Sequence, residues 1–182
     1  MIASIWVAFA TTSVFGIGQL TQCSKPKVQA YFTKVEFVNQ LPEVLQISHY
    51  LNRTDENITA LYVKFDLRED LDQLNGIFNI KFQHGKNLMN YSTLELNYCE
   101  AFQMVHKHYL VRMVFAGLRR VSNLPLKCPF KKDMQYYVNG FMIDNRVIPS
   151  YIPQLAFKAE ITAASKQRNI VDIILFGQVQ RK

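Results

Sequence analysis

Residues 155–179 read LAFKAEITAASKQRNIVDIILFGQV, and this stretch decides the fold class. Its first part alternates apolar with polar residues, and the apolar ones are Leu155, Phe157, Ala159, Ile161 and Ala163. After a polar turn at 165–169, the segment 171–179 again places apolar residues on one face. Alternation with a period of two is typical of strands that bury one face, so the stretch predicts an antiparallel pair.

The same alternation recurs at 59–67, 77–83 and 93–98, and residue types that favour strands also predict strands at 31–38 and 136–143. The connections are short, and Asn75-Gly76 favours a tight turn. Together with the C-terminal pair, this gives about seven strands. We expect a mainly β chain that folds as an antiparallel immunoglobulin-like β-sandwich.

The segment between Cys99 and Cys128 has a different pattern. Residues 100–121 contain no proline, one glycine and no alternation of period two, which predicts one helical segment. Apolar side chains would cover most of the circumference of this helix, so the helix should be largely buried or should cover an apolar space. An irregular crossover with a short helical piece is the alternative.

The first 18 residues carry no charged side chain, and a polar step and two lysines follow them. This pattern predicts a secretory signal peptide at 1–23, cleaved after Gly18 or Cys23, and a single domain at 24–182. An uncleaved signal anchor is the rival, although the stretch is at the short limit for crossing about 30 Å of hydrocarbon. No second apolar run is long enough to span a membrane. We therefore expect a secreted, extracellular protein.

In an oxidising compartment, two cysteines are by default a disulfide, which predicts a Cys99–Cys128 bridge. If cleavage follows Gly18, Cys23 would remain as a free thiol. The rival is a metal site, but the four histidines are not spaced as a zinc set. We expect no metal and no cofactor.

Three Asn-x-Ser/Thr sequons, at Asn52, Asn57 and Asn90, predict a glycoprotein when combined with an export signal. One or more would stay unused if its asparagine lay in a buried strand, and Asn90 is the main candidate for that.

The net charge of +7 comes from scattered lysines and arginines that form only short doublets. Without a run of five or more basic residues, this is typical of a solvated basic surface. We expect no nucleic-acid partner.

Five motifs follow one another in a specific order and spacing: YFTKV at 31–35, LNR at 51–53, LNYCEAF at 96–102, SNLPLKCPF at 122–130 and LFGQV at 175–179. In these motifs the chain resembles an insect family of secreted proteins of unknown function that includes the CheB chemosensory proteins. That family is distantly similar to the ML lipid-recognition domains and the ganglioside-activator proteins.

The resemblance implies a β-sandwich that holds an apolar ligand between its sheets, with no catalytic residues. It also matches Cys99 and Cys128 as the bridged pair. Members often carry a second cysteine pair, one partner near Phe37 and the other within 46–49, and this chain has no cysteine at either place. The resemblance therefore implies one bridge here.

We expect a secreted, non-enzymatic binding protein for a lipid or another apolar small molecule, with chemosensation as a candidate role. The chain has 13 phenylalanines and 9 tyrosines, which could line a pocket or fill a solid core. The candidate pocket residues are Phe65, Phe78, Phe82, Met104, Met113, Phe115, Phe157, Ile173 and Leu175.

The alternative is an extracellular protein-interaction module, such as a receptor or channel partner, with a solid core and an exposed patch. Arg112, Arg119 and Arg120 are candidate contributors to that patch. The chain lacks Gly-x-Ser-x-Gly, His-Glu-x-x-His and a phosphate-binding glycine loop, so we expect no enzymatic activity and no catalytic residue.

Overall fold

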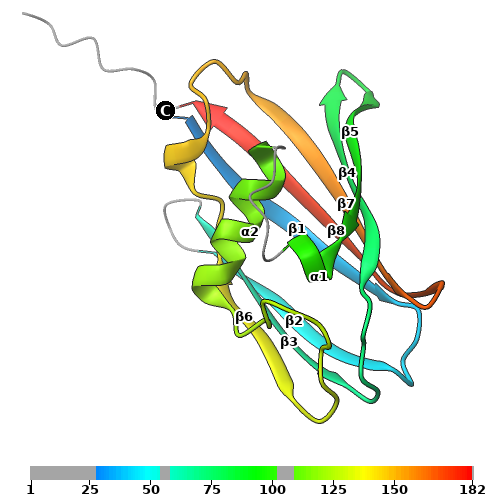
Figure 1. The fold of residues 1–182 in the computed structure, drawn as a ribbon. Helices are drawn as coiled ribbons and strands as arrows, with labels where there is room; N and C mark the ends of the chain where they lie inside the picture. The colour runs from blue at the N-terminus through cyan, green and yellow to red at the C-terminus, as the bar shows by residue number, and fades with distance from the viewer. Residues whose placement is uncertain (1–27, 54–57, 102–108, 182) are drawn as a thin grey trace, which may run out of the picture.

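The structure is a computed structural model that describes residues 28–53, 58–101 and 109–181. In these residues, eight strands form two antiparallel sheets that stack as two layers (Figure 1). The prediction of a mainly β sandwich is confirmed. The predicted signal peptide, Asn57 and Met104 lie outside the described residues.

The larger sheet has the strand order β1-β8-β7-β4-β5. Its strands, in that order, are Val28–Asn39, Arg168–Arg181, Leu155–Ser165, Asn75–His84 and Asn87–Asn97. The smaller sheet has the order β2-β3-β6. Its strands are Leu45–Arg53, Thr59–Leu67 and Gln135–Phe141.

The hairpin of β7 and β8 is the antiparallel pair that residues 155–179 predict. Ile161 lies opposite Ile173 and Ala159 opposite Leu175, so the alternating apolar residues of the two strands share one face. The turn consists of Lys166 and Gln167, whose φ angles are 49° and 64°. Two consecutive positive φ angles match the hairpin turn whose twist suits the flanking strands.

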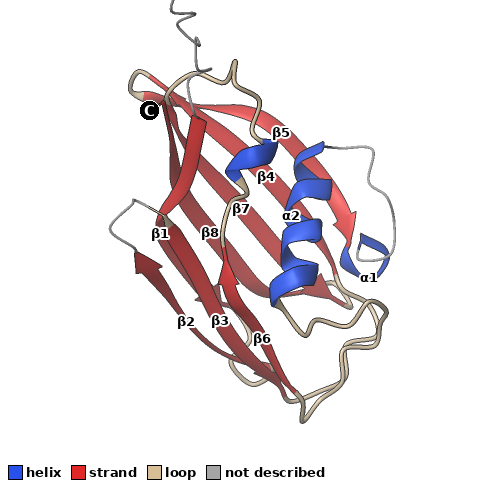
Figure 2. Ribbon diagram, turned by 90° about the vertical axis from the view of Figure 1, so that its left-hand side faces the viewer, coloured by secondary structure: helices blue, strands red, loops and turns tan. Residues whose placement is uncertain are grey.

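A helix completes the second layer. The short helix α1, Tyr98–Ala101, follows β5, and α2, Tyr109–Val121, lies beside β6 and over the larger sheet (Figure 2). The end of α2 is joined to β6 through Asn123, whose Nδ2 donates to the Gln135 carbonyl at 2.9 Å. The Tyr137 amide donates to Asn123 Oδ1 at 2.7 Å. The smaller sheet and α2 therefore form one continuous cover.

Gly117 allows this close approach of the helix to the smaller sheet. A Cβ atom built at Gly117 would lie 2.7 Å from a ring carbon of Phe141, closer than real Cβ contacts allow. Any larger residue would push α2 away from β6.

The described elements refine three of the expectations. The chain has an eighth strand, β2, which the sequence pattern did not predict. The helical segment predicted between the two cysteines is present as α1 and α2, and residues 102–108 lie outside the described part of the chain. The strand expected at 93–98 is longer at its start, since β5 begins at Asn87.

The predicted disulfide forms between Cys99 and Cys128, with the two Cα atoms 5.3 Å apart. Cys99 lies in α1, and Cys128 lies in the segment between α2 and β6. Next to it, the amide of Phe130 donates to the Leu71 carbonyl at 3.0 Å, and the reverse bond is 2.9 Å long. The bridge thus closes the part of the chain that contains α2 and joins α1 to the segment between α2 and β6.

Replacing both cysteines with serine should lower the free energy of unfolding by about 3–4 kcal/mol, because the bridge closes a loop of sequence separation 29. Urea unfolding of the double variant measures this loss. Wild-type protein unfolded with a reductant is the control and should match the variant. A loss below about 1 kcal/mol would show that the bridge does not constrain the unfolded chain as this loop length requires.

Candidate ligand cavity

Two cavities lie between the layers. The first, here the sheet cavity, has a volume of about 230 Å³ and is bounded by residues of both sheets and by Val111, Val114, Phe115 and Leu118 of α2. The second, here the loop cavity, has a volume of about 530 Å³. It is bounded by the larger sheet, by α2 and by the segment at 142–155 that leads from β6 to β7.

The walls of the sheet cavity are almost wholly hydrocarbon. Among the described residues that line it, Tyr98 is the only one whose side chain has a polar atom, and its hydroxyl donates to the Thr162 carbonyl at 3.2 Å. Burial raises the pKa of Tyr98, so its hydroxyl stays neutral. A cavity with such walls repels water and suits an apolar occupant.

The loop cavity has a mixed wall. Most of its lining is apolar, but Tyr91, Tyr109, Asp144 and Tyr151 bring polar atoms to it. The exposed fraction is 61% for Tyr91 and 78% for Tyr151, so this wall reaches the molecular surface. The loop cavity therefore combines apolar walls with polar groups near the solvent, which is the usual composition of a small-molecule site.

In the wall of the loop cavity, Asp144 makes polar contacts with two arginines. Its Oδ1 accepts from the Arg146 amide at 3.1 Å and from Nε at 2.9 Å, while Oδ2 accepts from Nη2 at 2.9 Å. Arg120 of α2 also lies 3.8 Å from Oδ2. The hydrogen bonds from Arg146 lower the pKa of Asp144 to about 2, so this carboxylate is ionised above that pH.

The two cavities share a partition of side chains. The residues that line both are Phe78, Val114, Phe141, Ile161 and Leu175. They come from four strands and from α2, and all are apolar. A movement of these side chains would join the two cavities into one apolar channel.

The eight candidate pocket residues that the structure describes all line one cavity or both. Phe65, Phe115 and Ile173 line the sheet cavity. Phe82, Met113 and Phe157 line the loop cavity. Phe78 and Leu175 belong to the partition, and the binding role of all eight stays a prediction.

Sequence reasoning missed the residues that close the loop cavity. Ile148 and Ile152 lie in a segment without periodicity, so no strand or helix pattern marks them. Ile143 falls in the strand predicted at 136–143, but β6 ends at Phe141. Val114 could have been found, because it is adjacent to the face of Val111, Phe115 and Leu118 on the predicted helix. Phe141 lies at the end of a predicted strand, but nothing in the sequence places it against Gly117.

Two of the three predicted glycosylation sites lie in the described residues. Asn52 is the next-to-last residue of β2 and is exposed. Asn90 lies in β5 and is also exposed, so it is not in a buried strand. The use of both sites stays a prediction.

No described helix is long and apolar enough to cross a membrane. Within residues 28–53, 58–101 and 109–181, no three His, Cys, Asp or Glu side chains gather as ligands for a metal ion.

No curated protein matches this chain. The model of a family described as "protein of unknown function (DUF1091)" matches residues 74–159. This range runs from the residue before β4 into β7, and it includes both cysteines of the bridge and α2. The chain is therefore similar, over this range, to an uncharacterised family.

Proposed function

We propose that this chain is a secreted, non-enzymatic binding protein that holds a lipid or another apolar small molecule between its two layers. The observation that carries the proposal is the pair of adjoining cavities, whose partition consists only of apolar side chains. Clefts of about 300–1,000 Å³ with mostly apolar walls and a few polar groups are typical ligand sites. The loop cavity, at about 530 Å³, falls in this range.

The energetics of the sheet cavity support an occupant. Apolar side chains that face space instead of other atoms lose the energy of dispersion contacts, and the sheet cavity leaves about 230 Å³ of such space. An apolar ligand would recover much of that energy by restoring dispersion contacts.

The distribution of polar atoms favours one ligand orientation. The hydrocarbon part of a ligand would lie toward the sheet cavity, where the one polar group among the described lining side chains, the Tyr98 hydroxyl, already donates to the Thr162 carbonyl. A polar group of the ligand would lie in the loop cavity, near Tyr109 and Tyr151. The ligand class that fits best is an elongated molecule with one polar end.

The proposal agrees with the resemblance to the insect secreted family that includes the CheB chemosensory proteins, and with its distant similarity to ML lipid-recognition domains. The rival function, a protein-interaction module, predicted a solid core and an exposed apolar or basic patch, with Arg112, Arg119 and Arg120 as candidate contributors. Arg112 instead lies over the Tyr109 ring at 5.7 Å, and Arg120 is paired with Asp144. The cavities favour the ligand-binding function.

Filling the cavities should abolish ligand uptake. Ala159 lines the loop cavity and Ala163 lines the sheet cavity, both on the inner face of β7. Leucine at either position would occupy space that the ligand needs, so we expect at least a tenfold loss of affinity, about 1.4 kcal/mol, for a fluorescent fatty acid. Titration of the probe fluorescence measures the affinity.

Ala156→Leu is the matched control, because Ala156 lies on the opposite face of the same strand, beside Gln178. It should bind the probe as the wild type does. Equal binding by all three variants, or no uptake by the wild type, would contradict the proposal. Thermal unfolding of each variant shows whether the fold is kept.

The uptake of a neutral apolar probe should not change between about pH 4 and about pH 8. Asp144 is the only carboxyl among the described lining residues, and its pKa is lowered to about 2. Folding favours the ionised form of Asp144. The contribution of this carboxylate to the free energy of unfolding is therefore complete above the ordinary carboxyl pKa and is lost as the pH falls toward 2. Probe titrations at several pH values test this, and a binding midpoint inside the range would contradict it.

A further inference from the structure

The two sheets have four edge strands, β1, β5, β2 and β6, and two of them are covered. Asn123 hydrogen-bonds to the outer edge of β6, as described above. On β1, the Phe32 amide donates to Thr59 Oγ1 at 2.7 Å, and the Ala30 amide donates to Asn145 Oδ1 at 2.8 Å. Side chains thus occupy backbone groups that another chain could otherwise pair with.

The outer edges of β2 and β5 have no strand paired to them among the described residues. Both strands also expose apolar side chains, with exposed fractions of 59% for Tyr50 on β2 and of 51% and 58% for Leu88 and Met89 on β5. An exposed apolar edge strand is a template for pairing with a second copy of the chain. These two edges are therefore the places where this fold is open to association.

β2 and β5 have few of the residues that usually prevent an edge strand from pairing with another chain. Neither strand contains proline or lysine, and each has a single Asp, Glu, Lys or Arg residue, Arg53 in β2 and Glu95 in β5. One bulge interrupts β5, since Lys81 lies opposite Asn90 and Ile80 opposite Ser92, which leaves Tyr91 between them. A bulge gives local protection only, and Leu88 and Met89 precede it.

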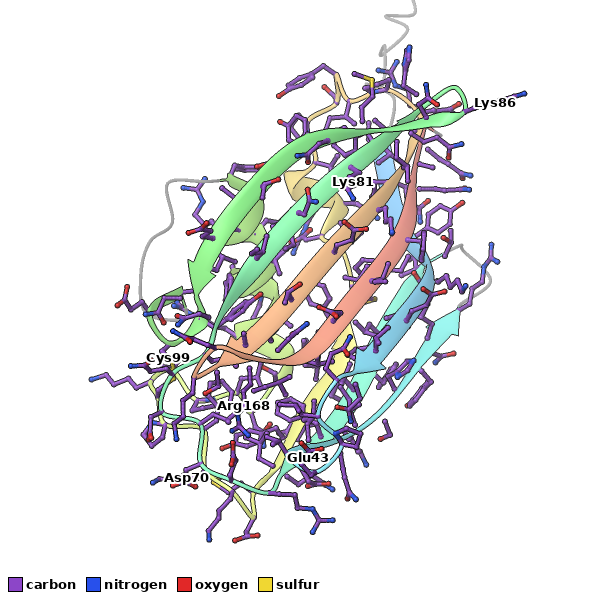
Figure 3. The ribbon with its side chains drawn as sticks, turned by 90° about the vertical axis from the view of Figure 1, so that its right-hand side faces the viewer. Glu43, Asp70, Lys81, Lys86, Cys99 and Arg168 are labelled. Atoms are coloured by element: carbon purple, nitrogen blue, oxygen red, sulfur yellow. A yellow bond between two sulfur atoms is a disulfide. The ribbon has the colours of Figure 1, made fainter. Side chains whose placement is uncertain are left out.

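The two described sequons lie on these two strands. Asn52 is in β2, on the same side as Tyr50, whose ring stacks on Tyr62 at a centroid distance of 4.6 Å. Asn90 is in β5, opposite Lys81. Figure 3 shows Lys81 on the outer face of the larger sheet, where it pairs with Glu160 at 2.6 Å.

Both asparagines therefore point away from the cavities. Tyr91, which follows Asn90, points inward instead and packs on Phe82 at a centroid distance of 4.7 Å. A modification at Asn52 or Asn90 would leave the space between the layers clear.

We propose that Asn52 and Asn90 carry N-linked glycans that prevent edge-to-edge pairing of the two sheets. A paired strand would lie about 4.8 Å from the edge, within the space that a bulky, hydrated glycan would occupy. The glycans take the place of the edge lysines and prolines that β2 and β5 lack. This inference requires passage through the secretory pathway but does not depend on ligand binding.

The experiment uses the full chain secreted from a eukaryotic host. Glycopeptide mass spectrometry gives the occupancy of Asn52 and Asn90. Size-exclusion chromatography with light scattering then gives the molar mass of the wild type and of the Asn52→Gln/Asn90→Gln variant over a range of concentrations. The Asn57 sequon stays intact in all variants, so that they differ only at Asn52 and Asn90.

We expect glycans at both sites and a monomeric wild type. In the glutamine variant, the molar mass of the polypeptide should rise with protein concentration to about twice the monomer value or more. Asn52→Lys/Asn90→Lys lacks the glycans but places a charge on each edge, so it should be monomeric. If the glutamine variant does not fold, enzymatic deglycosylation of the folded wild type replaces it. Lack of a glycan at Asn52 or Asn90, a folded monomer after loss of both of these glycans, or association of the lysine variant would overturn the proposal.

Discussion

A sheet of five strands faces a sheet of only three, and this mismatch in width determines the rest of the structure. The smaller sheet cannot cover the whole apolar face of the larger one, so another element must cover the remainder. Helix α2 does so, because it lies beside β6 and presents Val111 and Phe115 to the larger sheet. Gly117, Asn123 and the Cys99–Cys128 bridge keep it there.

A helix and a sheet in one layer do not pack against a twisted sheet as uniformly as two sheets do, since their surfaces differ in shape. The two cavities lie where these surfaces meet, and the partition between them includes Val114 of α2 and Phe141 of β6. The space for a ligand is thus a consequence of how the second layer is built. The segment at 142–155 then closes one end of this space and brings Asp144 and Tyr151 to its wall.

Much of this fold could be predicted from the sequence, because most strands bury one face and alternate strictly. β2 was missed because His49, which is exposed and lies against the Phe37 ring at 4.4 Å, stands between Ile47 and Leu51 in the alternating series and so breaks the apolar pattern. The disulfide was predictable because two cysteines remain outside the expected signal peptide. The candidate pocket residues followed from the inward faces of strands, which line the space between layers in any sandwich.

The division of that space could not be predicted. It depends on the close approach of α2 to Phe141 and on the irregular path of residues 142–155, and neither produces a periodic signal. The exposure of Asn52 and Asn90 on edge strands was equally hidden, since strand order is set by pairing between residues distant in sequence. Sequence pattern therefore predicts the inner faces well and the edges poorly.

The central claim is that an apolar molecule fills the space between the layers, and native mass spectrometry of the protein purified from a eukaryotic host tests it most directly. We expect folded protein to carry an additional mass that corresponds to an apolar compound and is released on denaturation. A spectrum of folded protein without any bound compound, even after incubation with fatty acids, would contradict the claim.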